Sequence, residues 1–540
     1  MDRPVDIDDL ARRGLDIEQL HPEQRRAVEA ALSGRDVLAV LPTGSGKSAI
    51  YQLAGAALPG PTVVVSPLIA LQQDQVVALR SEQVGEAVPV NSSLSASQRR
   101  EAFEDLRQGE AEFVFLAPEQ LARPEVVENL RASRPSVFVV DEAHCISSWG
   151  HDFRPDYLGL GRVVDALGHP VVLALTATAA PPVRAEIIAR LGLRDPEVVL
   201  DSFDRPNIRL SVEHPEDARE KDGAVLDRAS VLAAGHRSGI VYVATRKRTE
   251  ELAEALNRRG LRAAAYHAGL RRADRDRVQE RFMGDEVDVI VATTAFGMGI
   301  DKPDVRFVLH ADAPESLDSY YQEIGRAGRD GRDAEAVLFF RQADLGVRRF
   351  LGSGGGVKAD QVGEVLEVLD EAGGSTDLED LERSVGLSRR RLVLALSRLE
   401  DGGAVELDGD EVRAEVEDPD DAIRAVEAEE EQRRELTASR VEMVTAYAET
   451  RACRRRLLLG YFGERYDHEC GSCDTCESGT AARRSALLDQ QPHPIGSRVR
   501  HGELGEGQVA WAEGETLIVL FDAAGYQRLS SRRDPLETVE

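Results

Sequence analysis

The segment LPTGSGKS (41–48) has the residue types and spacing of a loop that binds nucleotide phosphates. Its glycines let backbone N–H groups close around phosphate oxygens, and the helix expected after it adds a favourable dipole. Lys47 would reach the β- and γ-phosphates, and the Ser48 hydroxyl would complete the coordination of Mg²⁺. The strict pattern has glycine at position 41, where this chain has leucine, but strand, loop, GKS and helix in succession disfavour an ordinary glycine-rich turn. The predicted nucleotide-binding residues here are Thr43, Gly44, Ser45, Gly46, Lys47 and Ser48.

A second apolar run, VFVVDEAH (137–144), ends in two carboxylates. At the carboxyl end of a strand, Asp141 can hold Mg²⁺ through water, and Glu142 can orient and deprotonate an attacking water. A lone Asp-Glu pair is more often a solvated strand end. Because this pair comes about 95 residues after the phosphate-binding loop, we interpret it as catalytic.

Two arginines in QEIGRAGRDG (322–331) could supply positive charge to a phosphoryl-transfer transition state. Arg326 and Arg329 are the candidates. The alternative is an ordinary surface loop, but glycines at 325 and 328 favour close approach of the backbone.

Aromatic residues gather in HCISSWGHDFRPDY (144–157), although only 5% of the chain is aromatic. The rings of Trp149, Phe153 and Tyr157 could stack on unpaired bases, while Arg154 holds phosphate beside His151. A buried aromatic cluster is the alternative. We reject it because the segment directly follows a catalytic carboxylate and is too polar to bury cheaply.

Four of the five cysteines follow a C-x₁₆-C-x₂-C-x₂-C pattern: Cys453, Cys470, Cys473 and Cys476. Four thiolates satisfy tetrahedral zinc, and this spacing predicts a structural zinc site. An iron–sulfur cluster uses similar spacing and is the main rival. His468 is interpreted as a bystander, and Cys145 as a small buried residue.

The elements that must position these residues alternate between β-branched runs and amphipathic helical stretches from about 35 to 350. Such runs bounded by helices predict parallel sheets covered on both faces. Two sets lie in tandem, divided near 201–230, so we expect an α/β protein with two lobes: residues 1–205 and 206–350.

Three smaller parts are expected after a linker at GSGGG (352–356). Two helices about Gly386 and a hairpin at Asp408-Gly409 indicate a winged-helix-like segment at 358–416, whose arginines at 389–391 could touch phosphates. Because its other surfaces are acidic, a protein-facing or purely spacing role is the alternative. The zinc module is placed at 417–478. After a second linker, alternating apolar and polar residues at 492–540 predict a small β-barrel.

The formal charge of −29 argues mildly against a nucleic-acid partner, but about half the excess lies in residues 361–440, with 24 acidic and 10 basic side chains. Binding would therefore depend on local basic surfaces such as Arg451, Arg454, Arg455 and Arg456. No apolar run of membrane-spanning length and no signal peptide are found, so a cytoplasmic location is expected, with no membrane partner.

Taken together, LPTGSGKS, SPLIALQQDQ, DEAHCISSWGHDFRPDY, LTATA, YHAGL, ATTAFGMGIDKPDVR and YYQEIGRAGRDG resemble the motif series of superfamily 2 helicases, in the RecQ branch. The resemblance covers about residues 10–345 and the cysteine region. It implies two RecA-like lobes that hydrolyse ATP with Mg²⁺ to move 3′ to 5′ on single-stranded DNA, together with a structural Zn²⁺. It further implies a role in repair or recombination and association with the nucleoid. The tail resembles Tudor-like β-barrels that dock protein partners.

The resemblance also implies roles for single residues. Gln24 would read adenine, Arg329 would be the arginine finger and Arg326 its phosphate-contacting neighbour. His144 and Thr176 would couple hydrolysis to DNA. The segment from 144 to 157 resembles the aromatic-rich loop of the family, which assigns DNA binding to Trp149, His151, Phe153 and Arg154.

The chain also departs from the family pattern. Ile17 and His21 stand where an aromatic residue and an arginine usually surround adenine. The winged-helix candidate precedes the zinc module instead of following it.

Two other functions stay open at this point. An RNA helicase shares the two-lobed motor, although the aromatic segment and the cysteines favour DNA. A DNA-binding regulator could use the lobes as a nucleotide switch, although such a switch need not keep Lys47, Glu142 and Arg329 together.

Overall fold

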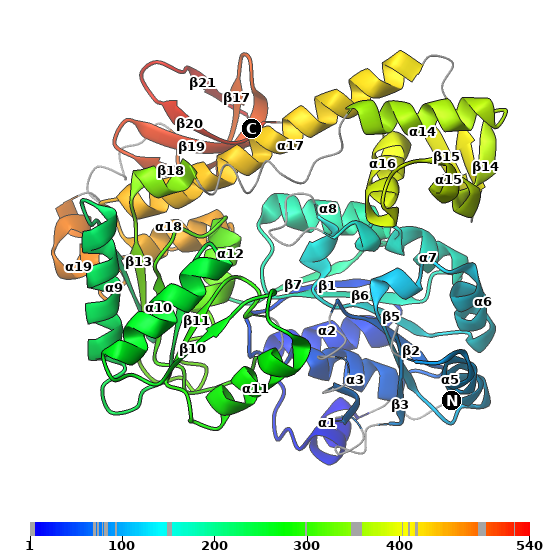
Figure 1. Cartoon of the computed structure of the whole chain (residues 1–540), viewed down its shortest axis with the longest axis horizontal. Helices are drawn as coiled ribbons and strands as arrows, with labels where there is room; N and C mark the ends of the chain where they lie inside the picture. Colours follow the sequence, from blue (N-terminus) through cyan, green and yellow to red (C-terminus); the bar gives the residue numbers. More distant parts are fainter. Residues whose placement is uncertain are drawn as a thin grey trace. The chain divides into compact units, whose positions relative to one another are not determined.

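The structure is a computed structural model of the chain. It describes residues 6–67, 72, 75–77, 79, 85–91, 94–147, 154–297, 300–346, 359–401, 403–408, 411–415, 419–483, 493–522 and 524–539 (Figure 1). The described residues fall into two compact units. The first contains the chain up to 41, residues 45–201 and those from 359 to 434; the second contains 42–44, 202–346 and 435–539.

The first unit is built on a seven-stranded sheet in the order β3-β4-β2-β5-β6-β1-β7, with every pairing parallel. Its strands are β1 (Val37–Val40), β2 (Thr62–Val65), β3 (Ala87–Val90), β4 (Phe113–Leu116), β5 (Val137–Val140), β6 (Val171–Thr176) and β7 (Glu197–Leu200). The central strands are completely buried, which explains their β-branched composition.

Helices cover both faces of this sheet: Figure 1 shows α2 and α3 on one face and α7 and α8 on the other. The helices are α1 (Ile7–Leu15), α2 (Pro22–Leu32), α3 (Lys47–Ala57), α5 (Ala96–Gln108), α6 (Pro124–Ser133), α7 (Leu160–Ala166) and α8 (Pro181–Leu191). Short 3₁₀ turns are η1 (Pro118–Gln120), η2 (Ala143–Ile146) and η3 (Pro155–Tyr157). Because parallel strands all end at one edge, β1, β5 and β6 deliver the predicted nucleotide residues to the same edge.

The first unit also contains a small helix-and-sheet segment with its own apolar core. Its elements are α14 (Ala359–Glu371), β14 (Ser375–Asp377), α15 (Leu378–Ser384), α16 (Arg389–Asp401), β15 (Val405–Asp408) and β16 (Glu411–Ala414). The three strands form an antiparallel sheet in the order β14-β16-β15. The two helices about Gly386 and the hairpin are confirmed. Gly409, in the predicted hairpin turn, and the predicted linker at 352–356 lie outside the described residues.

The second unit holds a six-stranded parallel sheet in the order β10-β11-β9-β12-β13-β8. Its strands are β8 (Ile208–Glu213), β9 (Gly239–Tyr242), β10 (Ala263–Tyr266), β11 (Val289–Ala292), β12 (Phe307–His310) and β13 (Ala334–Phe339). The helices are α9 (Ala218–Leu232), α10 (Arg246–Arg258), α11 (Arg272–Met283) and α12 (Leu317–Ile324), with the 3₁₀ turn η4 (Gln342–Asp344). This sheet is the second predicted lobe.

The rest of the second unit contains the cysteines and a C-terminal sheet. The long helix α17 (Pro419–Glu449), which belongs to this unit from residue 435 onward, leads into α18 (Arg454–Tyr461) and α19 (Asp474–Glu477). The C-terminal sheet comprises β17 (Arg498–His501), β18 (Gly505–Glu513), β19 (Thr516–Phe521), β20 (Gly525–Ser530) and β21 (Leu536–Thr538). It is antiparallel, in the order β20-β19-β18-β17-β21, around a core that includes Val509, Val519 and Phe521.

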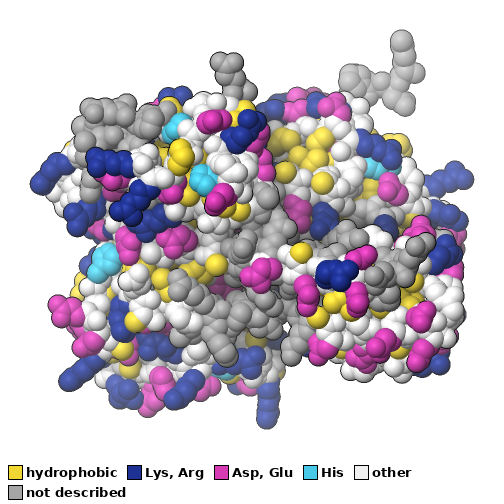
Figure 2. Space-filling view, turned by 90° about the horizontal axis from the view of Figure 1, so that it is seen from above, with side chains coloured by type: hydrophobic (Ala, Val, Ile, Leu, Met, Phe, Trp, Pro, Cys, Tyr) yellow, Lys and Arg dark blue, Asp and Glu magenta, His cyan; other side chains and the backbone are white. Residues whose placement is uncertain are grey.

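This architecture confirms the predicted fold class: two parallel-sheet lobes, a winged-helix-like segment, a cysteine module and a small C-terminal sheet. Among the described residues, no helix combines the length and the apolar character needed to cross a bilayer. Basic and acidic side chains are interspersed over the face that Figure 2 shows.

Candidate nucleotide site and metal centre

The phosphate-binding loop between β1 and α3 turns through two glycines with positive φ, 85° at Gly44 and 70° at Gly46. Gln24 of α2 supports the loop, because its side-chain nitrogen donates to the carbonyls of Ser45 and Gly46 at 2.9 and 3.1 Å. A Cβ at position 46 would lie 2.7 Å from that nitrogen, so this contact requires glycine. The sequence did not reveal this supporting contact, and the adenine role of Gln24 stays a prediction.

The residues predicted around adenine lie beside Gln24 along the chain. His21 is the N-cap of α2, and its backbone N–H donates to the side-chain oxygen of Gln24 at 2.9 Å. Ile17 is half-buried and packs against the apolar core of the lobe.

Lys47 and two carboxylates meet at the edge of the first sheet. The Nζ of Lys47 donates to the carbonyl of Leu41 at 3.0 Å. Asp141 follows β5 and is buried; burial and then the charge of Glu142 raise its pKa to about 7, against the opposing charge of Lys47. A carboxylate with so little compensating charge is suited to a divalent cation, which fits the predicted Mg²⁺ site.

Glu142 is joined to the neighbouring strand through His144. The backbone of Glu142 is in the left-handed region, with φ of 50°, a conformation that costs energy outside glycine and that is found at functional sites. The Nδ1 of buried His144 lies 3.3 Å from the Glu142 carboxylate and 2.9 Å from the Thr176 hydroxyl. Thr176 ends β6, which pairs with β5. The structure therefore brings together predicted residues from two motifs: Glu142 and His144 from VFVVDEAH, and Thr176 from LTATA.

The aromatic-rich segment is described only from Arg154 onward; Trp149, His151 and Phe153 lie outside the described residues. Arg154 donates to the carbonyl of Pro67 at 3.1 Å. Tyr157 is completely buried, and its hydroxyl donates to the Asp141 carbonyl at 3.1 Å. The prediction that its ring stacks on bases is therefore wrong: Tyr157 braces the strand end that carries the carboxylates.

In the second unit, Arg326 and Arg329 follow α12 on the loop 325–332. Arg326 is buried and donates to the carbonyl of Gly297. Arg329 donates to the Ile300 carbonyl and to the Asp301 carboxylate, both at 2.7 Å. Burial and then the charge of Arg326 lower the pKa of Arg329. The loop therefore concentrates positive charge, which favours an anion.

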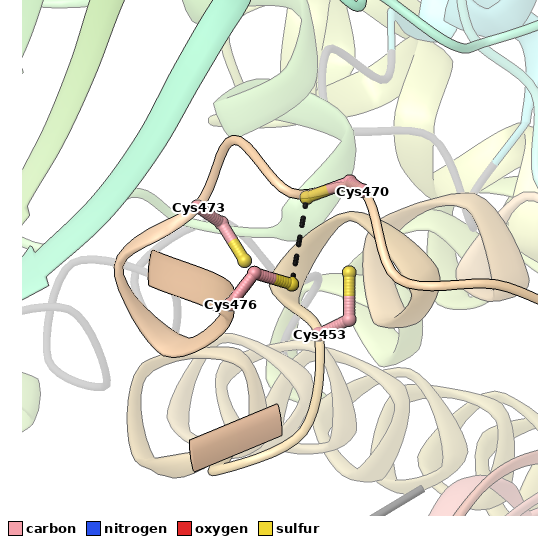
Figure 3. A group of neighbouring side chains, drawn as sticks. All are labelled: Cys453, Cys470, Cys473 and Cys476. Carbon is pink, nitrogen blue, oxygen red and sulfur yellow. Dashed lines mark hydrogen bonds between the residues drawn. The ribbon is translucent and has the colours of Figure 1, made fainter. Parts of the chain in front are cut away.

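The four predicted cysteines converge on one point: their sulfurs all lie within 4.8 Å of one another (Figure 3). Cys453 is the N-cap of α18, Cys473 is the N-cap of α19, Cys476 lies within α19, and Cys470 precedes it. Hydrogen bonds from Cys453 and then Cys470 hold the pKa of Cys473 far below its usual range. Such a set of sulfurs fits a tetrahedral zinc ion. His468 lies outside this group of four sulfurs, and its ring packs at a tilt against Tyr466, with centroids 4.0 Å apart. Cys145 is buried, as predicted.

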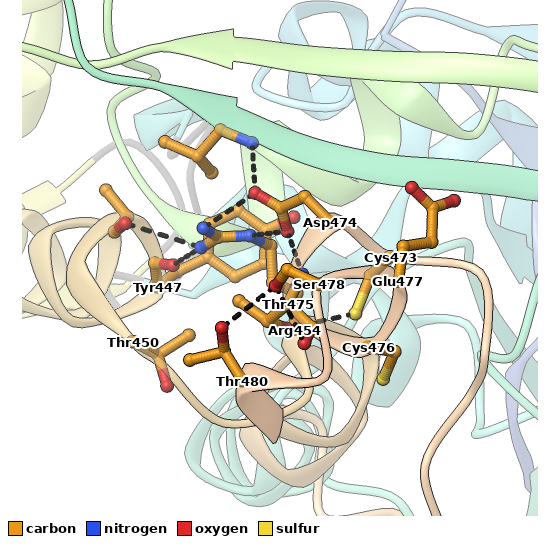
Figure 4. A network of polar contacts seen from close by, with 12 residues as sticks. Tyr447, Thr450, Arg454, Cys473, Asp474, Thr475, Cys476, Glu477, Ser478 and Thr480 are labelled. Atoms are coloured by element: carbon orange, nitrogen blue, oxygen red, sulfur yellow. Dashed lines mark hydrogen bonds and ion pairs between the residues drawn. The ribbon is translucent and has the colours of Figure 1, made fainter. Parts of the chain in front are cut away.

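Hydrogen bonds and an ion pair connect the cysteine loop (470–476) to neighbouring elements (Figure 4). Arg454 pairs with both oxygens of Asp474 at 2.5 and 3.0 Å and donates to the Tyr447 carbonyl at 2.6 Å. Because Arg454 and Arg455 are both buried, the prediction that they form a basic surface for nucleic acid is wrong. Asp474 also accepts from the backbone of Val212 in β8 at 3.1 Å. Leu210 of β8 and Cys473 form an isolated β-bridge, so the loop pairs with the edge strand of the second sheet.

Comparisons with known proteins agree with this geometry. The family model for DEAD/DEAH box helicases matches residues 21–186, and that for the helicase conserved C-terminal domain matches 224–331. Fold and site thus define a two-lobed helicase. A third model, RecQ zinc-binding, matches residues 414–477. The chain belongs to the RecQ helicase family.

Relatives cover most of the chain. The probable ATP-dependent DNA helicase RecS of Bacillus subtilis is 38% identical over 458 residues, which are 84% of this chain and 88% of that protein. The ATP-dependent DNA helicase RecQ of Haemophilus influenzae is 36% identical over 84% of this chain, which spans 60% of that longer protein. A crystal structure of the DUF1998 helicase MrfA bound to DNA covers 78% of this chain and 64% of its own, with a TM-score of 0.56 and 16% identity, and supports the fold alone.

Proposed function

We propose that this RecQ-family chain uses ATP hydrolysis to move 3′ to 5′ along single-stranded DNA and to separate duplexes in repair or recombination. Its family and its helicase domains make it an ATP-hydrolysing DNA helicase. The direction of travel, the biological role and the roles of single residues are the proposal.

At the nucleotide, we assign the β- and γ-phosphates to Lys47 and to the backbone of residues 43–46. Glu142 orients and deprotonates the attacking water. The guanidinium groups of Arg326 and Arg329 stabilise the charge that develops on the transferred phosphoryl group. Arg329 is the arginine finger. Burial and then the positive charge of the neighbouring Arg326 lower its pKa.

Two metals complete this assignment. Ser48 and Asp141 would hold Mg²⁺, which when bound neutralises phosphate charge. Cys453, Cys470, Cys473 and Cys476 would hold a structural Zn²⁺ that stabilises the loop around α19.

The observation that carries the proposal is the connection Glu142–His144–Thr176. A helicase must hydrolyse ATP faster when DNA is bound, so the water-activating carboxylate needs a link to a DNA-responsive part of the lobe. His144 supplies one, because it contacts the Glu142 carboxylate and the end of the next strand within hydrogen-bond distance. Trp149, His151, Phe153 and Arg154 are assigned to DNA by the family resemblance.

The test compares ATPase activity with single-stranded DNA and with RNA of the same sequence. Stronger stimulation by DNA is expected, and stronger stimulation by RNA would contradict the proposal. Unwinding of duplexes with a 3′ tail, but not of those with a 5′ tail, is expected for 3′ to 5′ movement. Lys47→Ala should abolish ATP turnover and leave DNA binding intact; retained turnover would refute the assignment of Lys47.

Two finer proposals rest on the family resemblance. The C-terminal sheet is proposed to dock a protein partner, and the chain is proposed to associate with the nucleoid in the cytoplasm. A pull-down with the full chain and with a chain ending before residue 493 tests the first; equal recovery of partners would refute it.

A further inference from the structure

A third arginine holds the backbone of the loop 325–332, which carries Arg326 and Arg329 and is called the arginine loop below. Arg205 precedes β8, and its guanidinium donates to the carbonyls of Gly325, Ala327 and Gly328 at 3.1, 2.9 and 3.0 Å. These three carbonyls flank Arg326 on both sides and directly precede Arg329. One planar fork therefore fixes the stretch of main chain from which both side chains leave.

Asn207, two residues after Arg205, also holds the arginine loop. Its side-chain nitrogen donates to the carbonyls of Gly328 and Arg332 at 2.8 and 2.9 Å. Gly328 has φ of 59°, and a Cβ there would lie 2.4 Å from the Asn207 nitrogen and 2.7 Å from the Arg332 carbonyl oxygen. This close approach gives the physical reason for glycine at position 328, which the sequence analysis had singled out.

The segment that carries Arg205 is itself held by the zinc module. Asp204 pairs with Arg455 of α18, and Arg455 also donates to the Ile208 carbonyl at 2.6 Å. One side chain of the module therefore contacts the chain on both sides of Arg205, at 204 and at 208.

A second side chain of the module reinforces this grip. The Glu464 carboxylate accepts from the Ser202 hydroxyl and from the backbone of Phe203, each at 2.7 Å. The Phe203 ring stacks on Phe462, with centroids 4.5 Å apart and an interplanar angle of 10°. The module thus contacts the segment 202–208 both through hydrogen bonds and through the stacked phenylalanine rings.

We propose that Arg205 is a positioning residue for ATP hydrolysis: it sets the arginine loop, and the zinc module sets Arg205. The inference rests on the proposed roles of Arg326 and Arg329. Arg205 acts through the loop backbone, since its guanidinium donates to three carbonyls of that loop. The structural module at the cysteines then also contributes to the rate of hydrolysis.

The test is Arg205→Met, which keeps the length of the side chain and removes its donors. The DNA-stimulated kcat should fall by about tenfold to a hundredfold, the order of effect of an ångström of misplacement at a reacting centre. The KM for ATP and the affinity for single-stranded DNA should stay within about twofold of wild type, because Arg205 contacts neither by this proposal.

Arg209→Met is the matched control. Arg209 lies in β8, directly after the segment 202–208. It pairs with Glu477 of the zinc module and with Glu335, and has no hydrogen bond to the arginine loop among the described residues. A kcat for Arg205→Met equal to that of Arg209→Met would overturn the proposal.

Two further variants keep the outcomes distinct. Arg205→Lys keeps a charge but cannot span three carbonyls, so an intermediate kcat is expected even if the methionine variant does not fold; an unchanged kcat overturns the proposal. Arg329→Ala tests the function beneath it. If Arg329→Ala keeps wild-type ATPase activity, the arginine assignment fails; if it loses activity while both Arg205 variants keep theirs, only the positioning role fails.

Discussion

A buried hydroxyl of the zinc module contacts α12, the helix that leads into the arginine loop. Tyr461 of α18 donates to the carboxylate of Asp318 on α12, and both residues are at most 3% exposed. Tyr461→Phe removes this hydrogen bond but keeps the ring, which stacks on Tyr526 at 5.1 Å. A hydrogen bond to a charged group contributes about 1.5–3 kcal/mol, so we expect local opening of α12 to become easier by about 2 kcal/mol.

Amide hydrogen exchange measures this directly, because exchange in α12 reports its local opening free energy. A loss of about 2 kcal/mol corresponds to about thirtyfold faster exchange of the α12 amides. Tyr466→Phe is the control, since Tyr466 lies in the same module and its ring packs against His468 with centroids 4.0 Å apart. Among the described residues, its side chain has no hydrogen bond to α12.

Two outcomes would contradict a stabilising role for the Tyr461 hydroxyl. Exchange in α12 that changes by less than about threefold would show that the hydroxyl does not stabilise the helix. An equal change in Tyr466→Phe would show a general effect on the module. In the double variant with Asp318→Asn, the tyrosine change should add little, because residues in contact are not additive.

Three other predictions concern the coupling link, the metal and a buried ion pair. Thr176→Val removes the hydroxyl 2.9 Å from His144 and should lower DNA-stimulated ATPase activity more than basal activity, measured with and without single-stranded DNA. Cys476→Ser should bring bound zinc, measured by atomic spectroscopy, well below one ion per chain and lower the thermal midpoint. Lys221→Met breaks the 2.8 Å pair with Asp312 and should destabilise the second unit by about 3 kcal/mol at neutral pH.

The Lys221→Met effect should depend on pH with a definite sign. Burial raises the pKa of Asp312, but the charges of Lys221 and then Arg248 outweigh it and bring the pKa below 3.8. A lowered folded-state pKa stabilises above the unfolded value and loses that contribution as pH falls. The difference between wild type and variant in urea unfolding should therefore shrink below about pH 4; a constant difference would contradict it.

Each of the other two predictions has a clear contrary result. Equal loss of basal and stimulated activity in Thr176→Val would place the hydroxyl in the chemistry instead of in coupling. Full zinc content in Cys476→Ser would show that three sulfurs suffice.

The nucleotide motifs were predictable because each lies at the end of one local run. The strands before Leu41 and Asp141 are short, β-branched and completely buried, so periodicity located them. The cysteines were predictable because spacing alone limits where four thiolates can meet. The domain ranges and residue roles stay predictions.

What the sequence could not reveal depended on contacts between distant segments. Arg205 and Gly325 are 120 positions apart, and nothing in the local pattern marks that arginine. Tyr157 looked available to DNA because its neighbours are polar, yet its ring is buried beneath Asp141. The strand β14 was missed since Ser375–Asp377 has the composition of a turn.

The β-bridge between Leu210 and Cys473 has a consequence for handling the protein. β8 is the outer strand of its sheet, and unpaired outer strands are templates for pairing with another chain. The cysteine loop covers that strand, with the Leu210 backbone donating to the Ser472 carbonyl at 3.3 Å. A chelating buffer that removes the zinc would then also free the outer edge of β8. The zinc-depleted chain should aggregate through this exposed strand edge.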